Sequence, residues 1–141
     1  MRKRGQRGAA LVEFALVSAL LFLLLFGIIE MGLIFMDQAQ VGQAAREAAR
    51  SAAVGNKITT AKLGAVNAGI GLTLSSANIV LDKSGNNGLT WAALGDSNTG
   101  NDAASGDLVR ATVTFAHPLV TSLVFTGGSR TLTAKMVMRR E

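Results

Sequence analysis

The sequence lacks cysteine and tyrosine, and it has one histidine and one proline. Without cysteine the chain forms no disulfide, thiolate nucleophile or Cys-based metal site. The lone histidine, His117, precedes Pro118, and such a residue is typically structural or exposed. No Ser-His-Asp order, phosphate-binding glycine loop or histidine cluster occurs. We therefore predict no catalytic residue, no metal ligand and no cofactor, and we expect that the protein is not an enzyme.

Positive charge is concentrated at the N-terminus of the 141-residue chain, whose formal net charge is +5. Arg2, Lys3, Arg4 and Arg7 supply four of these charges, and no acid offsets them there. The rest of the chain is therefore close to neutral. It shows no basic patch interleaved with aromatic residues, so we expect no nucleic-acid partner.

Large apolar residues are also concentrated, between positions 9 and 36, where only Glu13, Ser18 and Glu30 interrupt them. Residues 9–29 alone make a helix of about 30 Å, the thickness of the hydrocarbon core of a bilayer. No polar face is present, which predicts a transmembrane helix. The basic residues before it place the N-terminus in the cytoplasm and the bulk of the chain outside.

Two other kinds of N-terminal segment are alternatives to this interpretation. A secretory signal peptide has a shorter apolar core and a small-x-small cleavage site, which residues 35–38 do not offer. A plain signal anchor explains everything except Glu13. That carboxylate lies about 6 Å inside the membrane end, where an unpaired acid is costly and points to function, unless it reaches the headgroups.

The stretch around Glu13 resembles the processing site of type IV pilin-like precursors. In that family a prepilin peptidase cuts after a glycine, which here makes Ala9 the first mature residue, Glu13 the fifth and Phe14 the sixth. The resemblance implies a cleavage site at Gly8 and Ala9. It also implies that Glu13, followed by Phe14, attracts the new N-terminal amine of a neighbouring subunit during assembly.

A narrower resemblance is to the TadE-like (TadE/TadG-like) minor pilins of the tight-adherence (Flp, type IVc) pilus. It rests on RGAALVEFALVSALLFLLLFGIIEMG (7–32), GQAAREAARSAAVG (42–55) and the closing TLTAKMVMRRE (131–141). Two departures concern the helix only: many relatives carry a proline near Ser18-Ala19 and an arginine at the position of Leu33.

The sequence divides into a leader (1–8), a transmembrane and assembly helix (9–36), a helix continuation (37–55) and an extracytoplasmic head (56–141). In the continuation, Val41, Ala44, Ala45, Ala48 and Ala52 form a stripe that packs on its own head or on a partner. Gly55-Asn56 predicts the helix end. A short helix is expected at 60–68 and strands at 78–81, 89–94, 108–116 and 131–138. The predicted fold class is α+β, a long transmembrane helix joined to a short helix and an antiparallel sheet.

Two further features have alternative interpretations. Residues 95–107 contain Asp96, Asn98 and Asp102, which resemble fragments of a calcium loop, although a solvated turn fits their composition better. Glu30 lies at the outer membrane boundary. Its carboxylate is expected either to reach water or to contact the helix of another subunit.

These observations favour a minor pilin that contributes to pilus assembly and surface adhesion. The expected partners are the prepilin peptidase, other major and minor pilins, the inner-membrane assembly platform and membrane lipid. The expected location is the cytoplasmic membrane, single-pass with the head outside, and then the pilus or cell surface. The alternatives are a major structural pilin or pseudopilin, and a signal-anchored binding module that never polymerises.

Overall fold

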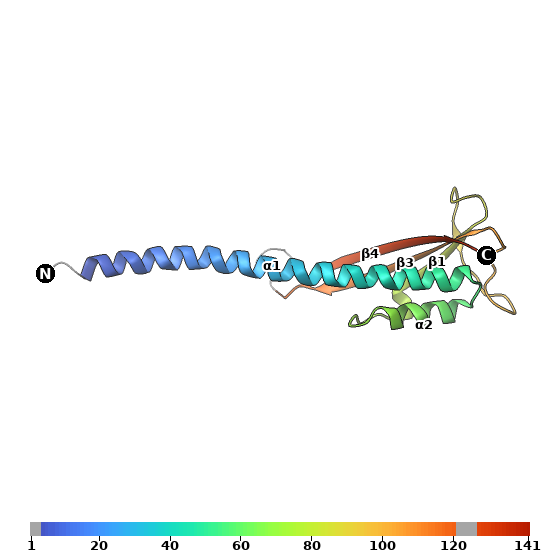
Figure 1. Ribbon diagram of the computed structural model, residues 1–141, viewed down its shortest axis with the longest axis horizontal. Coiled ribbons are helices and arrows are strands. Elements are labelled where there is room, and N and C mark those ends of the chain that lie inside the picture. Colours follow the sequence, from blue (N-terminus) through green and yellow to red (C-terminus); the bar gives the residue numbers. More distant parts are fainter. Residues whose placement is uncertain (1–3, 121–126) are drawn as a thin grey trace.

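The computed structural model describes residues 4–120 and 127–141, with side chains from Gly8 onward in the first helix. That helix, α1 (Arg4–Ala53), runs unbroken for 50 residues and carries a compact head on its second half (Figure 1). No proline interrupts it, and its residues are mostly strong helix formers.

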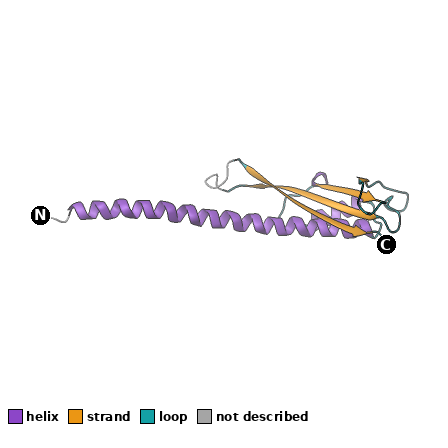
Figure 2. Cartoon of the chain, turned by 90° about the horizontal axis from the view of Figure 1, so that it is seen from above, coloured by secondary structure: helices purple, strands orange, loops and turns teal. Residues whose placement is uncertain are grey.

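The head contains one further α-helix and a small sheet. After α2 (Ile58–Ala68) and the short 3-10 helix η1 (Ser76–Asn78) come β1 (Ile79–Ser84), β2 (Ala92–Ala93), β3 (Leu108–Pro118) and β4 (Ser129–Arg139). The strand order is β2-β1-β3-β4 and every neighbouring pair is antiparallel. The sheet lies along the second half of α1 (Figure 2). The predicted α+β fold is confirmed.

The first half of α1 has no covering within the chain. From Gly8 to Ile29 every side chain is exposed except Ser18 and Gly27, which are half-buried. Among the described residues, this is the one helix long and apolar enough to cross a membrane, with a mean hydropathy of 2.6 in its best window. Such a surface fits a single-pass membrane anchor.

The second half of α1 forms the centre of the head. Val41, Ala44, Ala48 and Ala52 are completely buried and belong to one core cluster. The facing strand β3 contributes inward residues at every second position, namely Val109, Ala111 and Val113. Alanine side chains let the strands approach the helix closely. The stripe therefore packs on its own head, and that alternative is confirmed.

The end of α1 is fixed by contacts with residues far along the chain. Gly55 adopts a φ of 100°, which favours glycine, and a Cβ there would overlap the guanidinium of Arg140. Asn101 donates from Nδ2 to the carbonyl oxygens of Ala52 (2.8 Å) and Asn56 (2.9 Å). The helix thus ends where the Gly55-Asn56 pair predicted.

One predicted strand is much shorter than expected. The sequence pattern indicated a strand at residues 89–94, but only Ala92–Ala93 pair with β1. The side chain of Asn86 explains the difference, because its Oδ1 accepts from Thr90 N (2.9 Å) and from Ser84 Oγ (2.8 Å). These bonds fold residues 84–90 into a turn, and Leu89 is left 84% exposed.

Candidate functional site

The predicted cleavage site lies near the start of α1, at the opposite end of the helix from the head (Figure 1). Gly8 and Ala9 are helical and exposed, and a Cβ added at Gly8 would meet nothing within 4 Å. The glycine is therefore not required by the fold of this chain. Since proteases generally bind extended substrates, cutting here requires the first turns of α1 to unwind.

The predicted assembly residues are exposed on the same helix. Glu13 is exposed, and Phe14 is 69% exposed. Glu13 follows Ala9 by four residues, so both lie on one helix face. No hydrogen bond or ion pair to the Glu13 carboxylate is present among the described side chains. Both residues are therefore available to another molecule.

The residues predicted to set orientation are placed only in part. Arg2 and Lys3 lie outside the described residues. Arg4 and Arg7 belong to the first turns of α1, and their side chains also lie outside the described part.

A second polar site was not expected. Where α1 leaves the apolar span, the buried Glu30 and His117 and the half-buried Asp37 form a group that we call the junction cluster. His117 Nδ1 lies 2.7 Å from Asp37 Oδ2, and His117 Nε2 lies 3.7 Å from Glu30 Oε1. Glu30 Oε1 also accepts a hydrogen bond from Val120 N at 3.0 Å. Helix α1 and the end of strand β3 therefore meet through charged groups.

Both expectations for Glu30 are wrong. The residue is 1% exposed, so its carboxylate does not reach water, and it is bonded to its own head instead of being presented to another helix. The reason is the length of β3, which continues beyond the predicted residue 116 and brings His117 and Val120 down to Glu30. The role expected for His117 is confirmed, since it is 4% exposed and structural.

The junction cluster joins α1 to the end of strand β3 and has a structural role. The imidazole lies between two carboxylates, with Nδ1 in hydrogen-bond contact with Asp37 and Nε2 turned toward Glu30. Sequence reasoning missed Asp37, although a signal was present. Glu30 and Asp37 are seven residues apart, which places both acids on one face of a helix.

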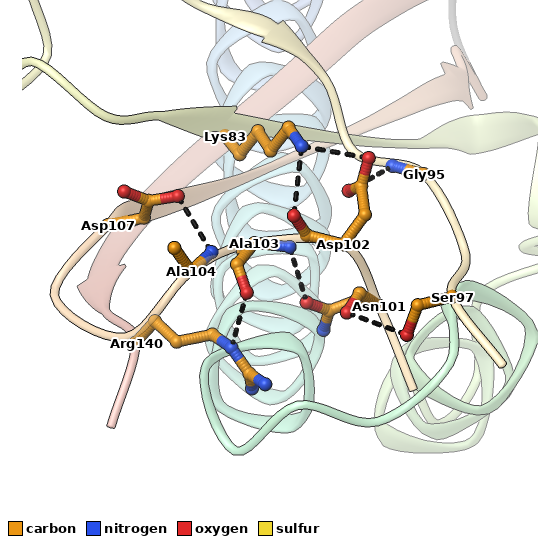
Figure 3. Close-up of polar contacts among 9 residues, drawn as sticks. All are labelled: Lys83, Gly95, Ser97, Asn101, Asp102, Ala103, Ala104, Asp107 and Arg140. Atoms are coloured by element: carbon orange, nitrogen blue, oxygen red, sulfur yellow. Dashed lines mark hydrogen bonds and ion pairs between the residues drawn. The ribbon is translucent and has the colours of Figure 1, made fainter. Parts of the chain in front are cut away.

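In the loop at 95–107, the acids that resemble fragments of a calcium loop are bound by groups of the chain itself (Figure 3). Lys83 Nζ binds both Asp102 Oδ2 (2.8 Å) and the Asp102 carbonyl oxygen (3.0 Å), while Gly95 N donates to Asp102 Oδ1 (2.7 Å). Asp96 accepts from Ile58 N at 2.7 Å, at the start of α2. These acids therefore bind groups of the chain itself, and a lysine ammonium stands beside Asp102.

The Lys83 ammonium also lowers the pKa of the Asp102 carboxyl. A carboxyl whose pKa is lower in the folded chain than in the unfolded chain stabilises the fold at neutral pH, and this contribution is lost on acidification. Asp102 is exposed, so solvent screening keeps the effect small.

Replacing His117 tests the junction cluster. His117→Leu should lower the free energy of unfolding by about 3 kcal/mol, because the half-buried Asp37 carboxylate loses its imidazole partner and the buried Glu30 carboxylate loses the ring beside it. Unfolding of the full chain in detergent micelles can be followed through the single tryptophan, Trp91. Arg50→Ala is the control. It breaks the exposed Glu47–Arg50 ion pair (2.8 Å) and should leave stability nearly unchanged. Equal stability of the two variants would contradict the structural role.

Comparison with known proteins bears on the exposed half of α1. A family model described as TadE-like protein matches residues 8–50. No curated protein and no solved structure matches the chain. The matched segment begins at the predicted cleavage glycine, contains Glu13 and Glu30, and ends in the part of α1 that packs in the head. The resemblance predicted from the sequence is therefore confirmed: through residues 8–50 the chain is similar to the TadE-like proteins.

Proposed function

We propose that this protein is a minor pilin-like subunit of a tight-adherence pilus, processed by prepilin peptidase after Gly8. The observation that carries the proposal is the family match over residues 8–50, a match to a pilus-associated, structural family. The matched segment holds both functional positions of the resemblance, the Gly8–Ala9 bond and Glu13. Orientation with the N-terminus in the cytoplasm, and later display of the head on the pilus or cell surface, belong to the same proposal.

The exposed face of α1 supports assembly through the helix. From Leu11 to Met36 its large apolar side chains lie open, except the half-buried Leu33 and Ile34, and lipid or other helices must cover the open ones. A shallow apolar groove on this part is lined by Leu23, Leu24, Gly27, Ile28, Met31, Gly32 and Phe35. A Cβ at Gly32 would meet nothing within the chain. Since glycine weakens a helix, its presence here is better explained by close packing of a second helix.

The size of the head supports the minor rank. Major subunits of tight-adherence pili are, by family resemblance, little more than the N-terminal helix. Here the second half of α1 is enclosed by α2 and the sheet, so a thin filament with a head at every position would be crowded. The exposed residues of the loop at 95–107 lie at the end of the head farthest from the membrane helix, where an adhesive contact would be made.

Leader removal is the first test. The mature protein should begin at Ala9, as judged by intact mass or N-terminal sequencing. Gly8→Leu should leave the leader attached, because a large branched side chain cannot occupy a peptidase site shaped for glycine. Gly5→Leu, which changes a glycine within the leader, is the matched control and should be processed normally. Mature wild-type protein that retains Met1 or Arg2 would contradict processing and favour the signal-anchored binding module.

The Glu13 carboxylate is tested by piliation. Glu13→Ala should insert into the membrane at least as well as the wild type, since a charged group in lipid is costly. It should nevertheless assemble poorly, because the amine of Ala9 in a neighbouring subunit loses its counter-charge. Ser18→Ala is the control: the Ser18 hydroxyl donates to its own Ala15 carbonyl oxygen (3.0 Å), and its loss should not affect assembly. Normal piliation of Glu13→Ala would exclude the assembly contact.

The rank of the subunit is tested by abundance. Quantitative mass spectrometry of sheared, purified pili should find few copies of this protein for each copy of the main subunit. Its deletion should reduce or abolish piliation, because a minor pilin acts in assembly and not as bulk material. If the protein is the dominant component of the fibre, the major-pilin alternative takes the place of the proposal.

A further inference from the structure

The closed end of the β3–β4 hairpin lies beside the point where α1 leaves the apolar span. Val120 N donates to Glu30 Oε1 at 3.0 Å, and Leu119 N donates to Gly128 O at 3.2 Å. Figure 2 shows β3 and β4 running back along α1 toward the middle of the helix. An 11-residue strand is about 36 Å long, and the helix from Glu30 to Ala53 is about 35 Å. The length of the strands therefore places the end of β3 and the start of β4 near Glu30.

Counting along α1 gives the depth of this position. A helix of 28 residues from Ala9 to Met36 is about 42 Å long, which exceeds the hydrocarbon core of about 30 Å but matches a bilayer of about 40–45 Å with its headgroups. With Ala9 at the inner edge of the core, Ile29 lies at the outer edge. Residues 30–36 then lie in the outer headgroup layer. Phe35 and Met36 agree with this, since they are 64% and 53% exposed.

The hairpin end, defined here as Leu119, Val120, Gly127 and Gly128, is apolar and uncharged. Val120 is 70% exposed, Leu119 is half-buried, and both glycines are exposed. Residues 121–126 lie outside the described part of the chain. In the sequence no charged residue occurs between His117 and Arg130. The polar N–H of Val120 is already bound by Glu30, so lipid can cover this surface without leaving a charge or that donor unpaired.

We propose that the hairpin end is a second membrane contact of the head, in which Val120 packs against phospholipid in the outer headgroup layer. The proposal rests on the membrane anchor and is independent of pilus assembly. A single helix leaves the head free to rotate about the helix axis and to tilt. A second contact at the side of the helix restricts both motions. It also covers the junction cluster on the side that faces the bilayer.

Because the sequence contains no cysteine, one introduced cysteine provides a single site for a thiol-reactive label. Single cysteines are introduced in the full chain by Val120→Cys, Val80→Cys and Leu20→Cys, labelled with an environment-sensitive fluorophore, and reconstituted in phosphatidylcholine–phosphatidylglycerol vesicles at low protein density. Val80 is the matched control. It is an exposed valine (52%) of the same sheet, paired with Thr112, about 20 Å farther along β3 than Pro118. Leu20 reports insertion of α1.

The label at position 120 should be quenched by lipids that carry a nitroxide near the headgroup. Its quenching by aqueous iodide should be several-fold weaker than at position 80, where the label should behave as in water. A water-like label at position 120, with position 20 quenched by lipid, would overturn the proposal and leave the anchor intact. Protection of position 120 that appears only at high protein density would assign the surface to a neighbouring subunit and would also overturn it. Loss of lipid quenching at position 20 would overturn the anchor and the hairpin contact together.

Discussion

The whole structure depends on one constraint, the continuity of α1 between an exposed apolar half and a half that forms the core of the head. Ala44, Ala48 and Ala52 are completely buried against the sheet, so the helix cannot slide or turn relative to the strands without creating overlap or voids. Among the described residues, no other long helix covers that face of the sheet. The head therefore cannot fold without the second half of α1, and that half continues into the apolar half within one unbroken helix.

The head holds the helix at two places, and each uses a different kind of interaction. At the far end, Asn101 donates to the Ala52 carbonyl oxygen in the last turn of α1, and Arg140 fills the space beside Gly55. At the membrane end, His117 and Val120 bind side chains of Asp37 and Glu30. Between these places the core contacts are apolar and involve small side chains, and Gln38 Nε2 donates to the Thr133 carbonyl oxygen of β4 at 3.2 Å. Motion of the helix along its axis is therefore transmitted to the head as a rigid body.

The parts of this fold that follow from local pattern were predictable, and those that depend on distant partners were not. The alternation of Val109, Ala111 and Val113 identified β3, and the glycine at position 55 identified the helix end. The turn around Asn86 was not foreseen, because its side chain competes with strand pairing in a way that alternation does not register. The junction cluster was missed for a similar reason: Glu30 and His117 are 87 positions apart, and only the length of β3 joins them.

The apolar half of α1 and its boundary carry two acidic residues, Glu13 and Glu30, which lie in different environments. Glu30 is buried by its own head, with a backbone donor and a histidine beside it, so its charge is accommodated before any other subunit is met. Glu13 lies beyond the reach of the head and is exposed on bare helix. A carboxylate in lipid is stabilised when it pairs with a cation, and no cationic group among the described side chains pairs with Glu13. Any selectivity that charge gives to helix–helix assembly is therefore concentrated at the N-terminal end of α1, and Glu30 serves the fold instead.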